Sequence, residues 1–166
     1  MTTKTFYMLC GLPGVGKSTY IADTVDRYLI PSFHVVSTDD LFENIAGFYG
    51  MTYNEVWALG IYDEVERITL SIAKKAFQDG PPAIFWDQTN LTPKSRQKKL
   101  AMVPEDYYKI CICLGVPEDW KDRLASRPGK VLPDNVLRNM EKTFVLPNVE
   151  EGFDEVRFVN FPRVEI

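Results

Sequence analysis

The sequence predicts an α/β fold, a parallel sheet flanked by helices, and two observations lead to this prediction. Apolar runs that favour strands alternate along the chain with stretches of helical spacing, as in parallel α/β sheets. Near the N-terminus, residues 11–18 read G-x-x-x-x-G-K-S, the motif of a phosphate-binding loop, between an expected strand and an expected helix. We therefore expect residues 1–166 to form a single domain with a P-loop NTPase or kinase fold.

The expected elements follow one another in a regular order. Strands are expected at residues 5–10, 33–37, 83–86, 108–114 and 155–160. Helices are expected at residues 19–29, after Asp40, from a Thr52-x-x-Glu55 capping box to residue 79, after Thr92-Pro93, at residues 117–125 and from Pro133. The long helix that ends before Gly80 is expected to bury residues that recur every three or four positions: Ile61, Val65, Ile68, Ile72 and Ala76.

The composition is that of an ordinary globular protein, with 45% hydrophobic and 25% charged residues. The apolar runs are too short to cross a bilayer and no secretory signal is apparent, so we expect a cytoplasmic protein without membrane contact. Cys10, Cys111 and Cys113 lie in apolar runs, which favours reduced core thiols over disulfides or a metal site. The net charge of −4 disfavours a surface that coats nucleic acid regardless of sequence, but it allows a local basic groove.

The fixed residues of the glycine-rich motif each have a role in binding ATP or another nucleoside triphosphate. The glycines allow the backbone to turn its N–H groups toward the phosphates. Lys17 is expected to reach the β- and γ-phosphates, and the hydroxyl of Ser18 is expected to bind Mg²⁺. The alternative is a glycine-rich turn with an incidental lysine. The residues expected to contact the nucleotide here are Gly11, Gly14, Val15, Gly16, Lys17, Ser18 and Thr19.

Carboxylates follow two of the expected strands. Ligands of open parallel sheets bind beyond the carboxyl ends of the strands, so these residues are candidates for catalysis. Asp39 is expected to act catalytically, although either it or Asp40 could instead cap the helix that follows. Asp87 ends an apolar strand as a Walker-B acid does, which favours a role with Mg²⁺ or its water shell over a turn-initiating role.

A basic stretch, residues 123–130, is expected to close over ATP and is called the lid below. Arg123 and Arg127 are four residues apart and precede a Pro-Gly break, and phosphoryl transfer needs cations near the γ-phosphate. The alternative is a solvated helix end whose arginines favour the helix dipole. A second basic group is interpreted as a solvated helix face or, alternatively, as part of a groove: Lys94, Arg96, Lys98 and Lys99.

Ordered blocks of the sequence resemble the kinase domain of phage-type 5′-polynucleotide kinases, enzymes of nucleic acid repair. The blocks are residues 11–19, Thr38-Asp39-Asp40, Asp87-Gln88-Thr89-Asn90-Leu91, Arg123-x-x-x-Arg127, residues 131–140, Pro147 and residues 151–156. The resemblance implies transfer of the γ-phosphate of ATP to the 5′-hydroxyl end of DNA or RNA. It implies Asp39 as the general base, Arg127 as the lid arginine on the donor phosphates, and Arg123 as a second lid cation that also contacts ATP. With Lys17, Asp39 and Arg127 form the expected catalytic set.

One position departs from this family. The family carries an arginine three residues after its first aspartate, where it holds a phosphate of the acceptor, and this chain has Phe42 there. Acceptor binding is therefore expected to use Arg96 as another cation or Phe42 as a stacking platform, although Phe42 could equally be a core residue. The expected acceptor-binding residues are Asp39, Phe42, Thr89, Asn90 and Arg96.

Two other functions remain open at this point. A kinase for a sugar, nucleoside or metabolite is favoured by Phe42 and by the sequence pI of about 5.1. A nucleotide-operated binding switch is less favoured, because the chain has neither an N-K-x-D run nor a D-x-x-G after the third expected strand.

Overall fold

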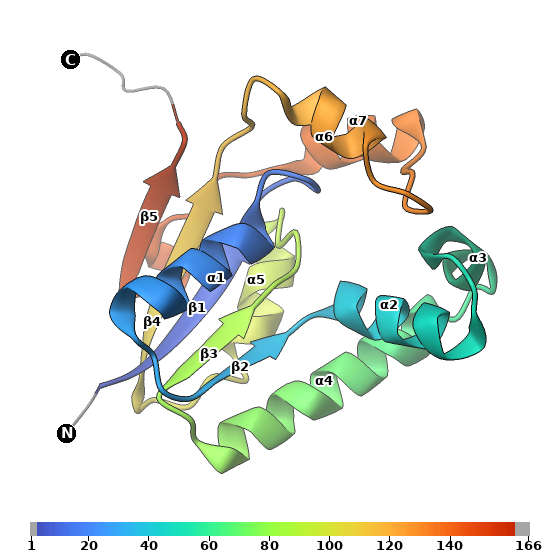
Figure 1. Cartoon of the computed structure of the whole chain (residues 1–166). Helices are drawn as coiled ribbons and strands as arrows, with labels where there is room; N and C mark the ends of the chain where they lie inside the picture. Colours follow the sequence, from blue (N-terminus) through green and yellow to red (C-terminus); the bar gives the residue numbers. More distant parts are fainter. Residues whose placement is uncertain (1–2, 162–166) are drawn as a thin grey trace.

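The fold of this chain, a computed structural model that describes residues 3–161, is built on a five-stranded parallel sheet (Figure 1). The strands are β1 (Lys4–Cys10), β2 (Phe33–Val36), β3 (Ala83–Trp86), β4 (Tyr107–Leu114) and β5 (Glu155–Val159), in the order β2-β3-β1-β4-β5. Each neighbouring pair is parallel. The predicted fold class is confirmed, and all five carboxyl ends lie at one edge of the sheet.

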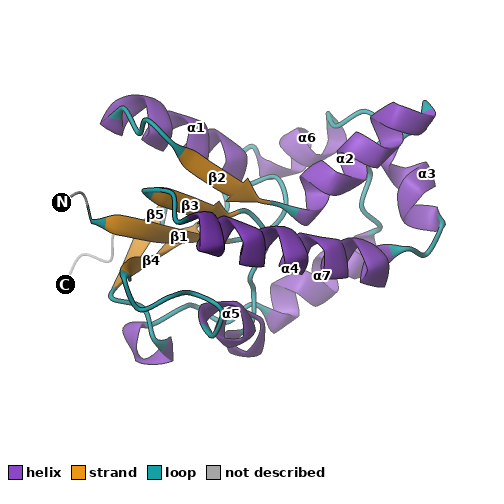
Figure 2. Cartoon of the chain, turned by 90° about the horizontal axis from the view of Figure 1, so that it is seen from below, coloured by secondary structure: helices purple, strands orange, loops and turns teal. Residues whose placement is uncertain are grey.

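Helices cover both faces of the sheet (Figure 2). The core on one face includes side chains of α1 (Lys17–Tyr28), α6 (Trp120–Ala125) and α7 (Asp134–Thr143). The core on the other face includes side chains of α4 (Tyr62–Asp79) and α5 (Pro93–Leu100). This two-sided coverage explains why every residue of β3 is buried, as a central strand of a parallel sheet requires.

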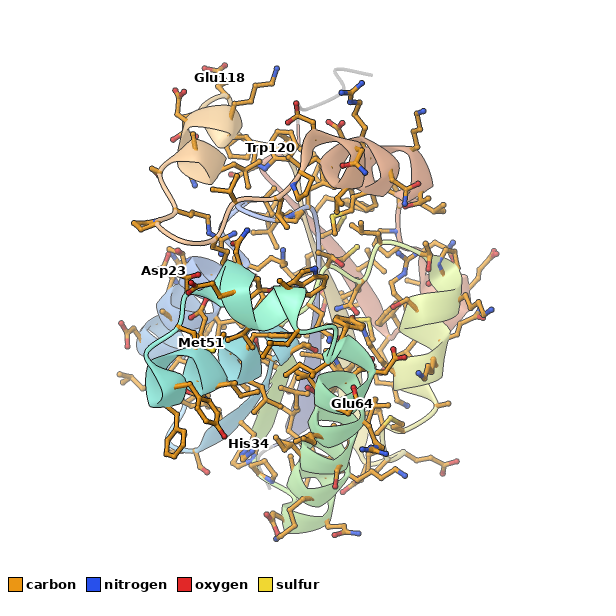
Figure 3. All side chains as sticks on the ribbon, turned by 90° about the vertical axis from the view of Figure 1, so that its right-hand side faces the viewer. Asp23, His34, Met51, Glu64, Glu118 and Trp120 are labelled. Atoms are coloured by element: carbon orange, nitrogen blue, oxygen red, sulfur yellow. The ribbon has the colours of Figure 1, made fainter. Side chains whose placement is uncertain are left out.

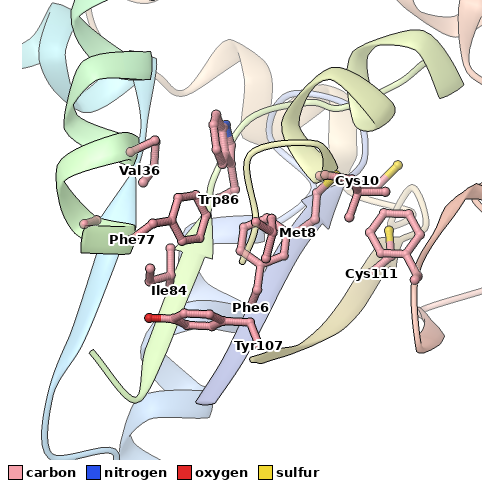
Figure 4. Close-up of a cluster of buried hydrophobic side chains, with 14 of the residues drawn as sticks. Phe6, Met8, Cys10, Val36, Phe77, Ile84, Trp86, Tyr107 and Cys111 are labelled. Atoms are coloured by element: carbon pink, nitrogen blue, oxygen red, sulfur yellow. The ribbon is translucent and has the colours of Figure 1, made fainter. Parts of the chain in front are cut away.

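The core on the α4 and α5 side is rich in aromatic and sulfur-containing side chains (Figure 4). Phe6 packs edge-to-face with Trp86, at 6.3 Å between ring centroids, and near Phe77, at 5.9 Å. The three cysteines are free and fully buried, in agreement with the prediction of core thiols. Within residues 3–161, no helix is both long and apolar enough to span a membrane.

The segment predicted as one long helix is two helices. Thr52 and Glu55 do form the predicted capping box, but it opens a short helix, α3 (Tyr53–Ala58). Gly60 then adopts a positive φ of 71°, which an α-helix cannot continue through, and α4 begins at Tyr62. The restart places Thr69, Ala73 and Ala76 on the buried face, whereas Ile68 and Ile72, predicted to be buried, are 45% and 38% exposed.

A helical arm, residues 38–61, projects from the carboxyl end of β2 (Figure 1). It contains α2 (Thr38–Tyr49) and α3, and it has a small apolar core of its own with the start of α4. The N-cap of α2 is Ser37, whose hydroxyl accepts a 3.1 Å hydrogen bond from the N–H of Asp40. Neither Asp39 nor Asp40 is therefore the cap, and both lie in the first turn. The remaining predicted elements occur with ends shifted by a few residues, and a short 3₁₀ helix, η1 (Val149–Glu151), precedes β5.

Candidate active site

The glycine-rich loop joins β1 to α1 and forms a site suited to an anion. Gly16 is the N-cap of α1, no side chain caps the helix, and its first turn has no acidic residue. The free N–H groups and the positive end of the helix dipole are therefore available to a phosphate. Lys17 folds over the loop, and its Nζ donates hydrogen bonds to the carbonyls of Gly11, at 3.1 Å, and Leu12, at 2.9 Å. Burial lowers the pKa of the Lys17 ammonium, while the charges of Asp87 and Asp39 oppose that shift.

The two predicted metal ligands lie together beside this loop. The Ser18 hydroxyl donates a 2.7 Å hydrogen bond to Oδ2 of Asp87, which follows β3. A hydroxyl and a carboxylate are hard oxygen ligands, and Mg²⁺ in kinases is held by one or two such groups together with substrate phosphates. Within the described residues, no group of three or more His, Cys, Asp or Glu side chains could hold a metal alone. The Ser18–Asp87 pair therefore fits a magnesium ion that arrives with a nucleotide.

Asp39 presents an ionised carboxylate near the phosphate loop. Its Oδ2 accepts a 2.8 Å hydrogen bond from Nζ of Lys130, and its Oδ1 accepts one of 2.8 Å from the hydroxyl of Tyr53. Burial raises the pKa of Asp39, but the hydrogen bond and charge of Lys130, with the Tyr53 hydroxyl, outweigh burial and hold the pKa below its usual value. Asp40 differs, because burial and the charge of Asp87 raise its pKa. The environment therefore favours Asp39 over Asp40 as the stable carboxylate.

Lys130 and Tyr53 are site residues that sequence reasoning missed. The Lys130 side chain is 9% exposed and forms ion pairs with Asp39, at 2.8 Å, and with Glu43, at 2.9 Å. Its Nζ also lies 4.2 Å from the centroid of the Tyr53 ring. The sequence carried one signal, because Lys130 ends the basic stretch that was interpreted as the lid. It gave no reason to pair that residue with Asp39, which is 91 positions away.

Helix α6, which leads into the lid, packs on the phosphate loop. Trp120 donates a 2.6 Å hydrogen bond from its indole Nε1 to the carbonyl of Pro13, and Figure 3 shows this residue at the same end of the molecule as the lid. Gly14 has a positive φ of 78°, and a Cβ there would lie 2.8 Å from Cδ2 of Leu124. The positive φ favours glycine at this position of the loop, against which α6 packs closely.

Arg123 of the lid lies beside the phosphate loop, and Arg127 lies near enough to Asp39 and Lys17 to affect both. Arg123 forms a 2.8 Å ion pair with Asp119, and its Nη1 would lie 3.8 Å from a Cβ placed on Gly16. Arg127 is half-buried, and its charge lowers the pKa of both Asp39 and Lys17. The lid is therefore positioned between the phosphate loop and the arm.

A cavity of about 590 Å³ lies between the arm and the lid. Figure 3 views the molecule from this side and labels Met51, at the junction of α2 and α3. The cavity borders Asp39 through three residues that contact it or its partner: Glu43, Tyr53 and Lys130. The other lining residues are Ala46, Gly47, Met51, Thr52, Ser126, Arg127, Pro128 and Gly129.

The structure contradicts the predicted acceptor contacts of Phe42 and Arg96. Phe42 is fully buried, with ring centroids 5.5 Å from that of Tyr53 and 5.2 Å from that of Trp57, so it is a core residue of the arm. Arg96 is also fully buried and forms a bidentate ion pair with Glu151, with both nitrogen–oxygen distances 2.7 Å. Neither side chain is available to stack on or neutralise an acceptor.

Asn90 and Thr89 support the phosphate loop. Asn90 is 2% exposed, and its Nδ2 donates a 2.6 Å hydrogen bond to the carbonyl of Leu9, while its Oδ1 accepts one from Lys99. The carbonyl of Thr89, which is half-buried, accepts a 3.0 Å hydrogen bond from the N–H of Gly11. The predicted acceptor contact of Asn90 is therefore wrong, and the block after β3 shapes the donor side instead.

The basic helix α5 is not a groove of free cations. Arg96 and Lys99 point inward, and burial lowers the pKa of Lys99 to about 8. Lys94 and Lys98 are exposed and form the solvated face. Both interpretations of the basic group, as a solvated helix face and as part of a groove, are therefore wrong for Arg96 and Lys99.

Known proteins share this fold. The protein family described as "AAA domain" matches residues 6–147 of this chain. A structure from Chloroflexus aurantiacus, provisionally described as a kinase, aligns with a TM-score of 0.65 at 17% identity over 96% of this chain and 86% of its own. A gluconokinase from Sinorhizobium meliloti aligns with a TM-score of 0.58 at 17% identity, covering 98% and 86%. A fungal RNA kinase aligns with a TM-score of 0.59 at 14% identity, covering 99% of this chain and 40% of its own. At these identities, the similarity shows the P-loop kinase fold.

Proposed function

We propose that this chain, which belongs to the AAA domain family, is a phosphotransferase that transfers the γ-phosphoryl group of ATP to a hydroxyl group. The proposal depends chiefly on one observation. The ionised carboxylate of Asp39, after β2, shares the carboxyl edge of the sheet with the Ser18–Asp87 pair after the adjacent strand β3. A switch protein would need a nucleotide-binding loop but would not need a second carboxylate that stays ionised beside it.

The reaction assigned to this site is an in-line displacement. The acceptor oxygen forms a bond to the γ-phosphorus, the bond from that phosphorus to the β,γ-bridging oxygen breaks, and ADP leaves. Asp39 accepts the proton of the attacking hydroxyl. Lys17 and Arg127 offset the negative charge of the transferring group. Mg²⁺ held by Ser18 and Asp87 would supply further positive charge at the phosphate oxygens.

The acceptor that the geometry supports better is a small molecule. The cavity beside Asp39, about 590 Å³, lies within the roughly 300–1,000 Å³ usual for small-molecule sites. Both residues expected to hold a polynucleotide, Phe42 and Arg96, are buried elsewhere. The cation next to Asp39 is Lys130, and it is already paired with two carboxylates.

A 5′-hydroxyl end of DNA or RNA is the second candidate acceptor. It is favoured by the order of blocks from the phosphate loop through Thr38-Asp39-Asp40 to the lid arginines. The fungal RNA kinase shows that an enzyme with this fold acts on RNA. A polynucleotide acceptor would need a path for its chain that starts at the cavity and uses exposed cations of the lid.

An acceptor screen with γ-labelled ATP tests these alternatives. The panel contains glycerol, glucose, gluconate, adenosine, adenosine 3′-monophosphate and 5′-hydroxyl oligonucleotides of DNA and RNA. We expect Asp39-dependent transfer to at least one small acceptor and slower transfer to the oligonucleotides. Rapid transfer to oligonucleotides alone would establish the second candidate, and the absence of transfer and of ATP binding would refute the phosphotransferase assignment.

A further inference from the structure

The ammonium of Lys130 lies at the centre of contacts from two helices of the arm. It donates to Oδ2 of Asp39, at 2.8 Å, and to Oε1 of Glu43, at 2.9 Å, both on α2. It also lies over the ring of Tyr53 on α3, 4.2 Å from the centroid. Charge-assisted hydrogen bonds and a cation–π contact together favour one position for a buried ammonium.

The backbone on both sides of Lys130 is held to the arm by a single residue, Asn54. The N–H of Asn54 donates to the carbonyl of Gly129, at 3.0 Å. Its side-chain Nδ2 donates to the carbonyl of Val131, at 2.8 Å, and its Oδ1 accepts from the N–H of Val131, at 3.0 Å. Figure 1 shows the segment between α6 and α7 extending toward α3. The C-terminal end of the lid is therefore attached to the arm, and this attachment sets the position of Nζ of Lys130.

The contacts with Lys130 and Tyr53 hold the carboxylate of Asp39 in one orientation. Oδ2 is bonded to Lys130 and Oδ1 to Tyr53, so rotation of the carboxylate would break a charge-assisted hydrogen bond. Each oxygen retains a further lone-pair direction with which to accept a proton. Phe42 packs behind Tyr53 and so supports the second of these two contacts.

We propose that Lys130 is a positioning residue for Asp39, through which the lid fixes the carboxylate that accepts the proton of the attacking hydroxyl. The inference rests on the proposed function, because it takes Asp39 as the base. Arg127 lies three residues before Lys130 in the same lid. The loop that positions the proton acceptor then also carries the arginine to which the proposed function assigns the charge of the transferring phosphate.

Removal of Lys130 should change the titration of Asp39 in a defined direction. The charged and titratable groups that face Asp39 are Lys130 and Arg127 of the lid, Lys17 of α1, Asp40 and Glu43 of α2, Tyr53 of α3 and Tyr62 of α4. Burial raises the pKa of Asp39, and Lys130 provides the largest opposing effects. Without Lys130, burial and the neighbouring carboxylates act against weaker opposition, so protonation of Asp39 moves to higher pH.

The first experiment measures the Asp39 carboxyl directly by ¹³C NMR titration of the full chain. Lys130→Met removes the charge at similar length, Lys130→Arg retains it, and Lys121→Met removes an exposed lysine of α6 as the matched control. We expect Asp39 to titrate at higher pH in Lys130→Met, and close to its wild-type pH in the other two. Identical titration of Asp39 in wild type and Lys130→Met would overturn the proposal.

The second experiment measures kinetics with the acceptor found in the screen. A misplaced base reduces kcat roughly ten- to a hundredfold in Lys130→Met, with little change in the Kd of ATP. The acid limb of the kcat/KM profile should move to higher pH, because Asp39 must be ionised to act. A lower Tm with an unchanged acid limb and unchanged kcat would leave Lys130 with a packing role alone and overturn the proposal.

A variant that keeps Lys130 tests the proposal even if Lys130→Met does not fold. Asn54→Ala deletes both side-chain hydrogen bonds to Val131 but keeps every charge near Asp39. We expect a smaller fall in kcat and a smaller shift of Asp39 in the same direction, and no shift in a folded Asn54→Ala protein would count against lid placement of Lys130. The NMR titration requires no turnover, so a wild-type protein that transfers phosphate to no acceptor refutes the proposed function without deciding the contact between Lys130 and Asp39.

Discussion

The donor side and the acceptor side of this site are assembled in different ways. On the donor side, residues 11–18 form one continuous loop, and Ser18 needs only Asp87 from a neighbouring strand end. On the acceptor side, Asp39 is held by Tyr53, which is 14 positions away, and by Lys130, which is 91 positions away. A phosphate group is the same in every nucleotide, so a short fixed loop can bind it. An acceptor differs from enzyme to enzyme, and its site depends on packing between distant segments.

The largest expected effect concerns the donor side. Lys17→Ala should reduce phosphoryl transfer by about a thousandfold, because the charge that offsets the transferring group is lost. The lysine faces its own loop carbonyls, so the fold should persist. Turnover with γ-labelled ATP and far-UV circular dichroism measure the two effects.

Lys74→Ala, on the exposed face of α4, is the matched control and should retain wild-type turnover. Near-normal turnover by a folded Lys17→Ala protein would mean that the loop does not act on the transferring phosphate. The donor side of this protein would then not work as a conventional phosphate-binding loop.

The second prediction concerns Arg96 as a core residue that takes no part in binding the acceptor. Arg96→Met should destabilise the protein by about 3–5 kcal/mol, because it leaves the carboxylate of Glu151 buried without its partner. The acceptor KM of the folded fraction should not change. Chemical denaturation measures the stability, and Lys98→Met, an exposed neighbour on α5, should alter it by less than about 0.5 kcal/mol.

An Arg96→Met protein with nearly unchanged stability and a raised acceptor KM would contradict this placement. It would restore Arg96 as an acceptor cation and require the segment around Glu151 to open during binding.

The sequence predicted most of the fold because its signals are local. A strand, a glycine loop and a helix with apolar spacing are each recognisable within about ten residues, and all five predicted strands occur. The long-helix prediction was wrong at Gly60, because the spacing from Ile61 to Ala76 continues smoothly whether or not the chain turns before it. The periodicity also favoured Ile68 and Ile72, whereas packing against the sheet selected the smaller Thr69 and Ala73.

The donor side of the candidate site was predictable from the sequence, whereas on the acceptor side Asp39 was predicted and its partners Tyr53 and Lys130 were not. Ser18 and Asp87 belong to motifs whose spacing implies their meeting, and the structure places them 2.7 Å apart. Arg96 illustrates the limit, since a basic residue in a basic helix gives no sign that a carboxylate 55 positions later will bury it. The role of Lys130 could not be predicted either, because only tertiary packing brings this residue to Asp39.

The third prediction separates the two adjacent aspartates. Asp39→Asn should lower kcat by about a hundredfold, because it deletes proton acceptance and the ion pair with Lys130. The Kd of ATP should stay nearly unchanged, because the phosphate loop is intact. Asp40→Asn should have a much weaker effect, because within residues 3–161 Asp40 forms no hydrogen bond or ion pair with Lys130 or Tyr53. Steady-state kinetics on both variants provide the comparison, and a severe Asp40→Asn defect beside a mild Asp39→Asn defect would reverse the assignment of the base.

The smallest expected effect tests whether Phe42 belongs to the acceptor side at all. Phe42 is fully buried among Tyr53, Trp57 and Tyr62, so Phe42→Leu should cost about 1–2 kcal/mol through lost aromatic contacts and slightly poorer filling. For a domain of this size that is a fall in Tm of roughly 2–8 °C. The acceptor KM should stay close to its wild-type value, because residue 42 lies behind Tyr53 and does not itself line the cavity. Thermal unfolding and acceptor kinetics on the same preparation decide the matter. A raised acceptor KM at unchanged Tm would show that Phe42 meets the acceptor, and the arm would then have to open before the reaction.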